Sequence, residues 1–267
     1  MTTLQVAGFS ASILIGVSLG LIGGGGSILT LPVLVYLLGI SPVISTAYSL
    51  FVVGTTALVG SINYMRQQQV NYKAAAVFAV PSFLAIFLTR KYLVPALPDP
   101  VFATDTFVLS KSVAIMVFFA LIMLAASYSM IRDRKAATDT PDGPLQFNFP
   151  LIAVEGLLVG TLTGIVGAGG GFLIIPALVL LARLPMKMAV GTSLLIIAAK
   201  SLVGFLGDLS TLTVDWSFLL PFTALAVLGI FLGTYISRFV PGEKLKKAFG
   251  WFVLAMGVYI IGHEIFI

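Results

Sequence analysis

The chain contains no cysteine and a single histidine, His263. Disulfide bonds, thiol chemistry and cysteine-based metal sites are therefore excluded. Charge is also scarce, because Asp, Glu, Lys and Arg together make up only 9% of the 267 residues. No GxxxxGK[ST] loop and no HExxH motif occurs, so the chain offers neither a phosphate-binding loop for ATP nor a zinc-binding protease helix. We expect no cofactor, no metal site and no enzyme activity.

Apolar residues fill most of the chain instead. The sequence is 59% hydrophobic and its mean hydropathy is +1.11, a balance that soluble domains do not have. The apolar runs are continuous, whereas strands of a membrane barrel alternate. We therefore expect an all-α polytopic membrane protein, whose net charge of +5 belongs to cytoplasmic loops rather than to nucleic-acid binding. The N-terminus lacks the features of a signal peptide, so the first helix should remain.

Polar links divide the apolar runs into two similar halves. The first half should span 1–131, a cytoplasmic linker 132–148, and the second half 149–267. A proline-rich loop is expected at Pro95–Asp105. The predicted helices of the first half are 4–22, 27–38, 42–63, 74–93 and 107–131. Those of the second half are 149–166, 172–182, 186–206, 216–239 and 245–265.

Two glycine-rich breaks interrupt these runs at corresponding places. Gly20–Pro32 reads GLIGGGGSILTLP, and Gly164–Pro176 reads GIVGAGGGFLIIP 144 positions later. At this offset, 14 of the 41 positions from 20 to 60 are identical without a gap. The helix after each break, at about 12 residues, rises only about 18 Å against a hydrocarbon core of about 30 Å. The sequence thus predicts an internal repeat, each half being a re-entrant broken hairpin followed by three transmembrane helices.

Loop charges predict that the two repeats have inverted topology. The link at 64–73 carries two bases, and its counterpart at 207–216 carries two acids and no base. With 64–73 in the cytoplasm, both termini lie outside. Arg90 and Lys91 are the exception to the positive-inside rule, at the outer edge. The other basic clusters fall on the cytoplasmic side, at 132–146, 183–187 and 238–247.

The glycine breaks are the first candidates for a binding site. A helix N-terminus carries free N–H donors and about half a positive charge, which together favour an anion. With inverted repeats, two such termini approach each other from opposite sides. The alternative is that the glycines only allow close helix packing. The substrate-binding residues expected here are Gly24, Gly25, Gly26, Ser27, Gly169, Gly170 and Gly171.

Lys200 stands near the middle of a predicted span, where a charge is costly and is a functional hypothesis by default. It either balances the charge of a bound anion or pairs with Glu155. Glu155 either carries a proton in coupled transport or lies near the cytoplasmic interface. Ser49, Thr192 and Ser193 follow the two hairpins and either donate to substrate oxygens or bond to the preceding helical turn.

These motifs resemble the TauE/SafE family of sulfite and sulfonate transporters, also called the 4-toluene sulfonate uptake permeases. The resemblance rests on GGGGSILTLPVL in one half and on GAGGGFLIIPALVLL, followed by AVGTSLLII, in the other. It covers essentially the whole chain, including the central hydrophilic loop. One difference between the halves is that Thr46-Ala-Tyr-Ser49 stands where the second half has Val190-Gly-Thr-Ser193.

The resemblance implies an anion carrier in a bacterial cytoplasmic membrane. We expect a secondary transporter that moves sulfite, thiosulfate or an organosulfonate such as taurine or sulfoacetate by alternating access. The two helix N-termini and Lys200 would form its positive site. An anion channel of the same fold is the alternative. The expected partners are the anion and the lipid bilayer, with no nucleic acid, while direction, coupling ion and oligomeric state stay open.

Overall fold

The computed structural model describes residues 3–93, 96–98, 100–104, 107–131, 149–166, 171–181, 184–209 and 212–266. Helices make up most of these ranges. The predicted linker at 132–148 and the glycines at 167–170 lie outside the described residues.

The predicted order of elements is confirmed in both halves. The first half contains α1 (Thr3–Ile22), α2 (Gly25–Pro32) with η1 (Val33–Leu37), α3 (Pro42–Arg66), α4 (Tyr72–Leu88) with η2 (Thr89–Leu93), and α6 (Lys111–Ile131). The second half contains α7 (Phe149–Val166), α8 (Gly171–Pro176) with η3 (Ala177–Leu181), α9 (Met186–Asp208), α10 (Trp216–Ser237) and α11 (Gly242–Phe266).

The predicted loop at Pro95–Asp105 is confirmed at residues 97, 98, 100 and 101, which have no helix or strand, and is wrong at 102–104. The predicted helix start at Phe107 is wrong. A β-hairpin occupies this region, in which β1 (Phe102–Thr104) pairs antiparallel with β2 (Phe107–Leu109). The apolar run from Phe107 led to the prediction of a helix. Phe, Val and Thr favour strands instead, and this local preference decides the structure at 102–109. Helix α6 begins only at Lys111 because Ser110 caps it, its Oγ accepting a hydrogen bond from the Val113 N–H at 3.3 Å.

Both short hairpin helices end in a π-helical turn, which the sequence did not predict. A proline closes the α-helical part in each case, Pro32 before η1 and Pro176 before η3. Proline has no N–H and its ring crowds the carbonyl four residues earlier, so the regular helix is disturbed there. Each exit then contains a backbone hydrogen bond between residues six positions apart. Ile40 N–H donates to the Leu34 carbonyl at 3.0 Å, and Leu184 N–H donates to the Leu178 carbonyl at 2.9 Å.

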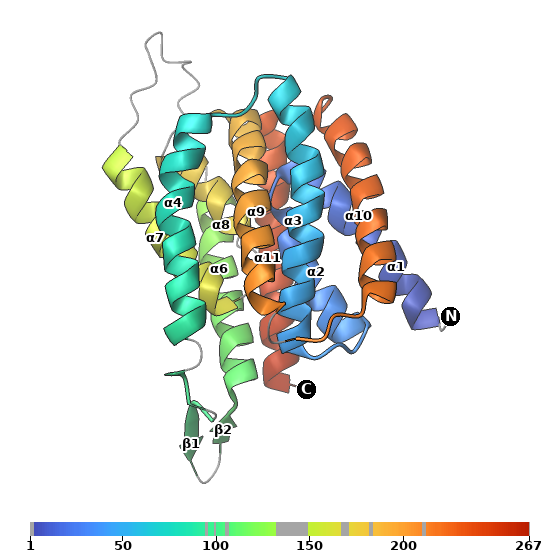
Figure 1. Ribbon diagram of the computed structural model, residues 1–267, viewed down its shortest axis with the longest axis vertical. Coiled ribbons are helices and arrows are strands. Elements are labelled where there is room, and N and C mark those ends of the chain that lie inside the picture. The colour runs from blue at the N-terminus through green and yellow to red at the C-terminus, as the bar shows by residue number, and fades with distance from the viewer. Residues whose placement is uncertain are drawn as a thin grey trace.

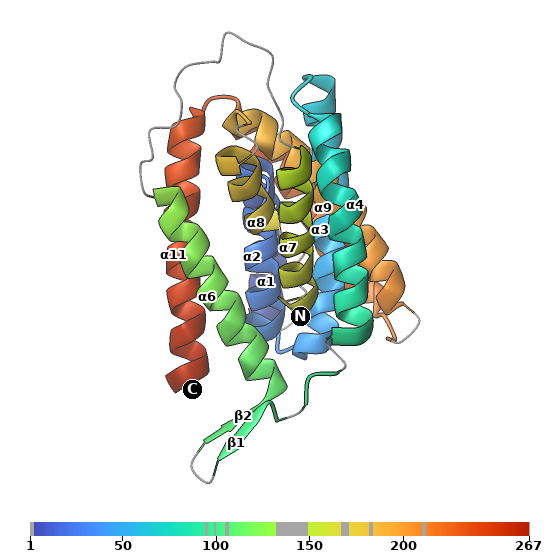
Figure 2. The same ribbon diagram turned by 90° about the vertical axis from the view of Figure 1, so that its left-hand side faces the viewer.

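The helices lie roughly along the long axis of the molecule (Figure 1). In the side view, α6 and α11 form one edge, α1, α2, α7 and α8 lie in the middle, and α3, α4 and α9 form the opposite side (Figure 2). The two hairpin helices α2 and α8 therefore lie in the interior, where they contact each other.

The first helix of each half packs on the middle span of the other half. A Cβ on Gly20 of α1 would lie 2.7 Å from the carbonyl oxygen of Ile230 in α10, so glycine is needed for this approach. The equivalent pair, α7 and α4, meets in the same way. The close contacts of α1 with α10 are Gly16 with Ala226 and Gly20 with Ile230. On α7, Gly160 meets Ser82 of α4, while Gly164 lies closest to Thr89 at the start of η2 and 3.4 Å from the Ile86 Cα.

The loops at the ends of these helices match as well. Asn71 caps α4 and Asp215 caps α10 through their side chains. The backbone N–H of Asn71 donates to the Thr192 hydroxyl at 2.9 Å, and that of Asp215 donates to the Tyr48 hydroxyl at 2.8 Å. Both the caps and the hydroxyls are 144 positions apart. The same cross-half contact is therefore made twice.

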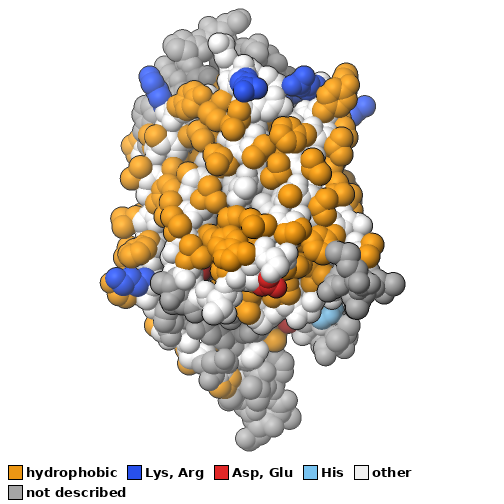
Figure 3. Space-filling model, turned by 45° about the vertical axis from the view of Figure 1, so that its right-hand side comes forward, with side chains coloured by type: hydrophobic (Ala, Val, Ile, Leu, Met, Phe, Trp, Pro, Cys, Tyr) orange, Lys and Arg blue, Asp and Glu red, His pale blue; other side chains and the backbone are white. Residues whose placement is uncertain are grey.

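Within the residues that the structure describes, four helices are long and apolar enough to cross a membrane, namely Ile44–Arg66, Tyr72–Leu93, Met186–Asp208 and Trp216–Ser237. Their apolar side chains form a broad band on the surface, with charged side chains towards the two ends (Figure 3). The exposed or half-buried bases Arg66, Lys73, Lys187, Arg238, Lys244 and Lys247 belong to helix ends at the upper end of Figure 1. The lower end carries Asp208 and Asp215, together with Lys91 and the start of α6 at Lys111.

Candidate functional site

The first glycine break consists of Gly23 and Gly24, between α1 and α2. Gly23 has a φ of +76°, in the left-handed region that residues with a Cβ rarely adopt. Gly24 is the N-cap of α2 and has no side chain to accept from the helix. A helix start leaves its first N–H groups without partners inside the helix, and of these the Ser27 N–H donates to the Gly24 carbonyl at 3.3 Å. Gly25 and Gly26, the first two residues of α2, therefore have N–H groups that the helix itself cannot pair.

The described parts of the two breaks lie against each other. A Cβ on Gly24 would lie 2.5 Å from the carbonyl oxygen of Gly171, at the start of α8. A Cβ on Gly171 would lie 3.2 Å from the Ser27 Oγ, which itself donates to the Gly24 carbonyl at 2.7 Å. The structure thus brings Gly24, Ser27 and Gly171 together. Gly169 and Gly170 lie outside the described residues.

One face of α9 runs past both breaks and ends at Lys200. This face carries Val190, Ser193, Ile197 and Lys200, which helical periodicity places on one side. The Ser193 Oγ donates to the Gly23 carbonyl at 3.1 Å, and Ile197 Cδ1 lies 2.5 Å from the Cβ position of Gly171. We call this set the α9 face.

Lys200 is buried, with 2% of its surface exposed. Its Nζ donates to the Thr163 Oγ1 at 3.3 Å, and Thr163 donates in turn to the Val159 carbonyl at 2.6 Å. Thr163 directly precedes Gly164 on α7. An ammonium group has three donors, and no carboxylate in the described ranges forms an ion pair with this one. The lysine is therefore a buried amine without an acidic partner in the described part of the chain.

The structure does not pair Lys200 with Glu155. Glu155 is also buried, and neither carboxylate oxygen has a hydrogen-bond partner among the described residues. It precedes Thr163 by eight residues on α7, a rise of about 12 Å. The chain therefore buries a basic and an acidic side chain that do not pair with each other. Within the described ranges, no three His, Cys, Asp or Glu side chains gather in a way that would hold a metal ion.

The three hydroxyl residues have different surroundings. Ser193 contacts the first break, whereas Thr192 points away from it and accepts the Asn71 N–H. Ser49 is buried, and its Oγ has no partner among the described residues. The same holds for Thr56, which occupies on α3 the position equivalent to Lys200 on α9. Only the second half therefore has a basic side chain at this position.

Sequence reasoning missed Ile197 and Thr163, which contact the site, and Thr56, which is the repeat equivalent of Lys200. Ile197 could have been predicted because it lies four residues after Ser193, on the same face of a helix. Thr56 could have been predicted because it lies 144 positions before Lys200. Nothing in the sequence indicates Thr163 as the partner of Lys200, because that contact depends on how α7 packs beside α9.

Relatives of this chain match nearly its whole length. The family described as sulfite exporter TauE/SafE matches residues 8–260. A probable membrane transporter protein from Xylella fastidiosa strain 9a5c is 31% identical over 253 residues, covering 93% of this chain and 91% of its own. The probable membrane transporter protein YunE from Bacillus subtilis strain 168 is 26% identical over 268 residues, covering 92% and 93%. No solved structure matches. Together with the apolar helices, these matches describe a multi-pass membrane protein.

Proposed function

The chain belongs to the sulfite exporter TauE/SafE family and is a membrane transporter, and from this premise we propose that its substrate is a small sulfur-containing anion. The class comprises sulfite, thiosulfate and organosulfonates such as taurine and sulfoacetate. The proposed mechanism is secondary transport by alternating access in a bacterial cytoplasmic membrane, with no enzymatic step.

The observation that carries this proposal is the α9 face, which joins both glycine breaks to Lys200. A helix N-terminus acts as about half a positive charge with donors aimed at the ligand. Sulfite and sulfonate groups present several acceptor oxygens to such N–H groups and to an ammonium. Because Lys200 has no acid to neutralise it within the described ranges, an anion would supply the missing negative charge in a region of low dielectric constant.

We further propose that the two halves are inverted repeats, which is what alternating access to one central site requires. The matching contacts of α1 with α10 and of α7 with α4 support this arrangement. The antiparallel course of α3 and α9 supports it too, since Gly54 meets Leu202 while Gly204 meets Leu50. The hairpin exits also fall at opposite ends, before α3 at the lower end and before α9 at the upper end (Figure 1).

The function is tested by flux through purified protein in vesicles. A carrier should show saturable uptake of labelled sulfite or taurine and faster exchange when the same anion is present on the other side. Substrate should also raise the melting temperature, since a ligand at 100 times its Kd stabilises by about 2.7 kcal/mol. Flux that neither saturates nor responds to anion on the far side would favour a channel. Absence of any flux of these anions would contradict the proposed substrate class.

We propose Glu155 as the proton-coupling group, because it is buried and unpaired among the described residues. Glu155→Gln should retain anion exchange, which needs no net proton movement, but lose most of the net transport driven by a pH gradient. The matched control is Glu264→Gln, since Glu264 is occupied by the Tyr36 hydroxyl at 2.6 Å. The two rates are compared in the same vesicles, and full gradient-driven transport by Glu155→Gln would remove Glu155 from the mechanism.

Both termini are proposed to lie outside the cytoplasm, with the upper end of Figure 1 inside, because most bases gather there. The cysteine-free chain makes this testable with single cysteines. An impermeant maleimide should label Thr213→Cys in intact cells, and should label Ala137→Cys only after the membrane is opened. The reverse pattern would invert the proposed orientation.

A further inference from the structure

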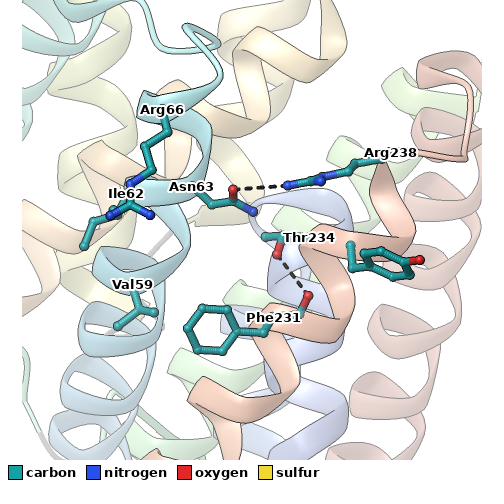
Figure 4. Close-up of a pocket in the computed structure, with 8 residues that line it drawn as sticks. Val59, Ile62, Asn63, Arg66, Phe231, Thr234 and Arg238 are labelled. Carbon is teal, nitrogen blue, oxygen red and sulfur yellow. Dashed lines mark hydrogen bonds between the residues drawn. The ribbon is translucent and has the colours of Figure 1, made fainter.

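A groove of about 450 Å³ lies between the upper ends of α3 and α10, away from the α9 face (Figure 4). Its polar rim consists of Asn63 and Arg66 on α3 and Arg238, which directly follows α10. Its deeper lining includes the apolar side chains of Ile62 and Phe231. None of the described residues that line it is acidic, so the groove is positively charged at one end and apolar below.

The polar rim has more donors than acceptors. Arg238 reaches across from α10 and donates to the Asn63 Oδ1 at 3.4 Å, and Gln67 donates to the same oxygen at 3.1 Å. This leaves the Asn63 amide nitrogen as a donor. Arg66 is exposed, and its side chain runs back along α3 beside Ile62 (Figure 4). Two guanidinium groups and an amide thus border one space, a donor set that suits a phosphate.

The groove opens towards lipid. Both of its helices are candidate membrane spans, and its apolar residues are exposed, Ile62 by 42%, Phe231 by 54% and Tyr235 by 60%. Exposed apolar side chains on a spanning helix face acyl chains. Arg66 ends α3 and Arg238 follows the end of α10, so both lie where phospholipid headgroups begin, and a tyrosine beside them is typical of that level.

The repeat provides an internal comparison. At the equivalent place on α9 and α4, Leu206 and Phe87 retain the exposed apolar wall. The rim is not retained, since the counterparts of Asn63, Arg66 and Arg238 are Gly207, Ser210 and Val94. Both halves of the repeat therefore have the exposed apolar residues, whereas only the groove between α3 and α10 has the two arginines. An arginine could also be present only to stabilise the C-terminal end of its own helix. That role does not require a contact with another helix, whereas Arg238 donates to Asn63 on α3.

We propose that this groove binds an anionic phospholipid, with its phosphate between Arg66 and Arg238 and an acyl chain along Ile62 and Phe231. Charge complementarity selects the anionic headgroup, because the rim holds two positive charges and its lining no negative one. Basic pockets between transmembrane helices bind anionic headgroups in this way.

The test is native mass spectrometry of the purified, delipidated full chain, titrated with phosphatidylglycerol or with phosphatidylcholine of the same chain length. Wild type should bind phosphatidylglycerol more tightly. The double variant Arg66→Gln/Arg238→Gln should lose that preference, by about tenfold or more. The matched control Lys73→Gln/Lys244→Gln removes the same charge from exposed bases at the same end and should bind as wild type does.

A second variant separates lipid from other occupants. Ile62→Trp fills the apolar part while keeping both arginines, and should also weaken phosphatidylglycerol binding in protein with an unchanged melting curve. Equal binding by the arginine variant and its control would overturn the proposal. Displacement of the lipid by inorganic phosphate at similar concentration would instead indicate a soluble-anion site. Cross-links between Ile62→Cys in two copies would indicate a dimer interface, and either result would also overturn it.

Discussion

Replacing Lys200 with methionine is expected to abolish anion transport while leaving the anion-free protein folded. The ammonium is 2% exposed, and its one hydrogen bond among the described residues goes to Thr163. Burying an unpaired charge is costly. Because no acid in the described ranges loses a partner, removal should leave the melting temperature unchanged or raise it. Transport should fall about 100-fold or more, which corresponds to about 3 kcal/mol of lost binding.

Two measurements together decide this prediction. Flux in vesicles reports the anion site, and melting curves with and without sulfite report both stability and binding. Ser201→Ala is the matched control, since its buried Oγ has no partner among the described residues and it lies one residue along the helix. A Lys200→Met protein that transports normally would remove the lysine from the site. One that melts much lower without anion would show that the lysine has a structural partner.

Gly24→Ala is expected to lower both stability and transport. The added Cβ would lie 2.5 Å from the carbonyl oxygen of Gly171 and 2.7 Å from its carbonyl carbon. These are backbone atoms, so the two hairpins must move apart. Overpacking of this kind costs about 1–3 kcal/mol, and a displacement of about 1 Å at a binding site can reduce a rate about 100-fold. Melting curves and exchange rates measure the two effects.

Two further variants, Gly26→Ala and Gly262→Ala, serve as comparisons for Gly24→Ala. A Cβ on Gly26 would lie 2.6 Å from the Ile15 carbonyl oxygen in α1, so this variant tests packing inside the first hairpin. No described residue outside its own stretch of α11 lies within 4 Å of the Cβ position of Gly262. Alanine there should stabilise by up to about 1 kcal/mol and leave transport unchanged. If Gly24→Ala behaves like Gly262→Ala, the two breaks do not need their close approach.

The helices were predictable because their apolar runs are long and bounded by strong local signals. Helix α7 has the predicted bounds of Phe149–Val166, with Pro150 near its start and a glycine break at its end. The hairpin at 102–109 was not predictable, because three-residue strands are too short to show a period. The π-helical turns were not predictable either, since proline disturbs a helix without fixing the form of the next turn.

The sequence could predict which residues form the site, but not the directions in which their side chains point. Neighbouring residues on a helix point about 100° apart, so Thr192 and Ser193 cannot both face the glycine break. The rotation of α9 decides which one does, and packing against other helices sets that rotation. Although Tyr48 and Thr192 differ between the halves, each provides a hydroxyl that accepts a hydrogen bond from a cap residue of the other half.

The packing of α1 on α10 has a consequence for biosynthesis. The Ser12 hydroxyl donates to the Phe222 carbonyl, 210 residues further along the chain. At about 5–20 residues per second, a ribosome needs roughly 10–40 s to make the intervening segment. During that time the newly inserted first helix carries a serine and glycine surface whose protein partner does not yet exist. The first segment to enter the membrane is therefore among the last to reach its final position, and chains that stop before α10 should be substrates for membrane quality control.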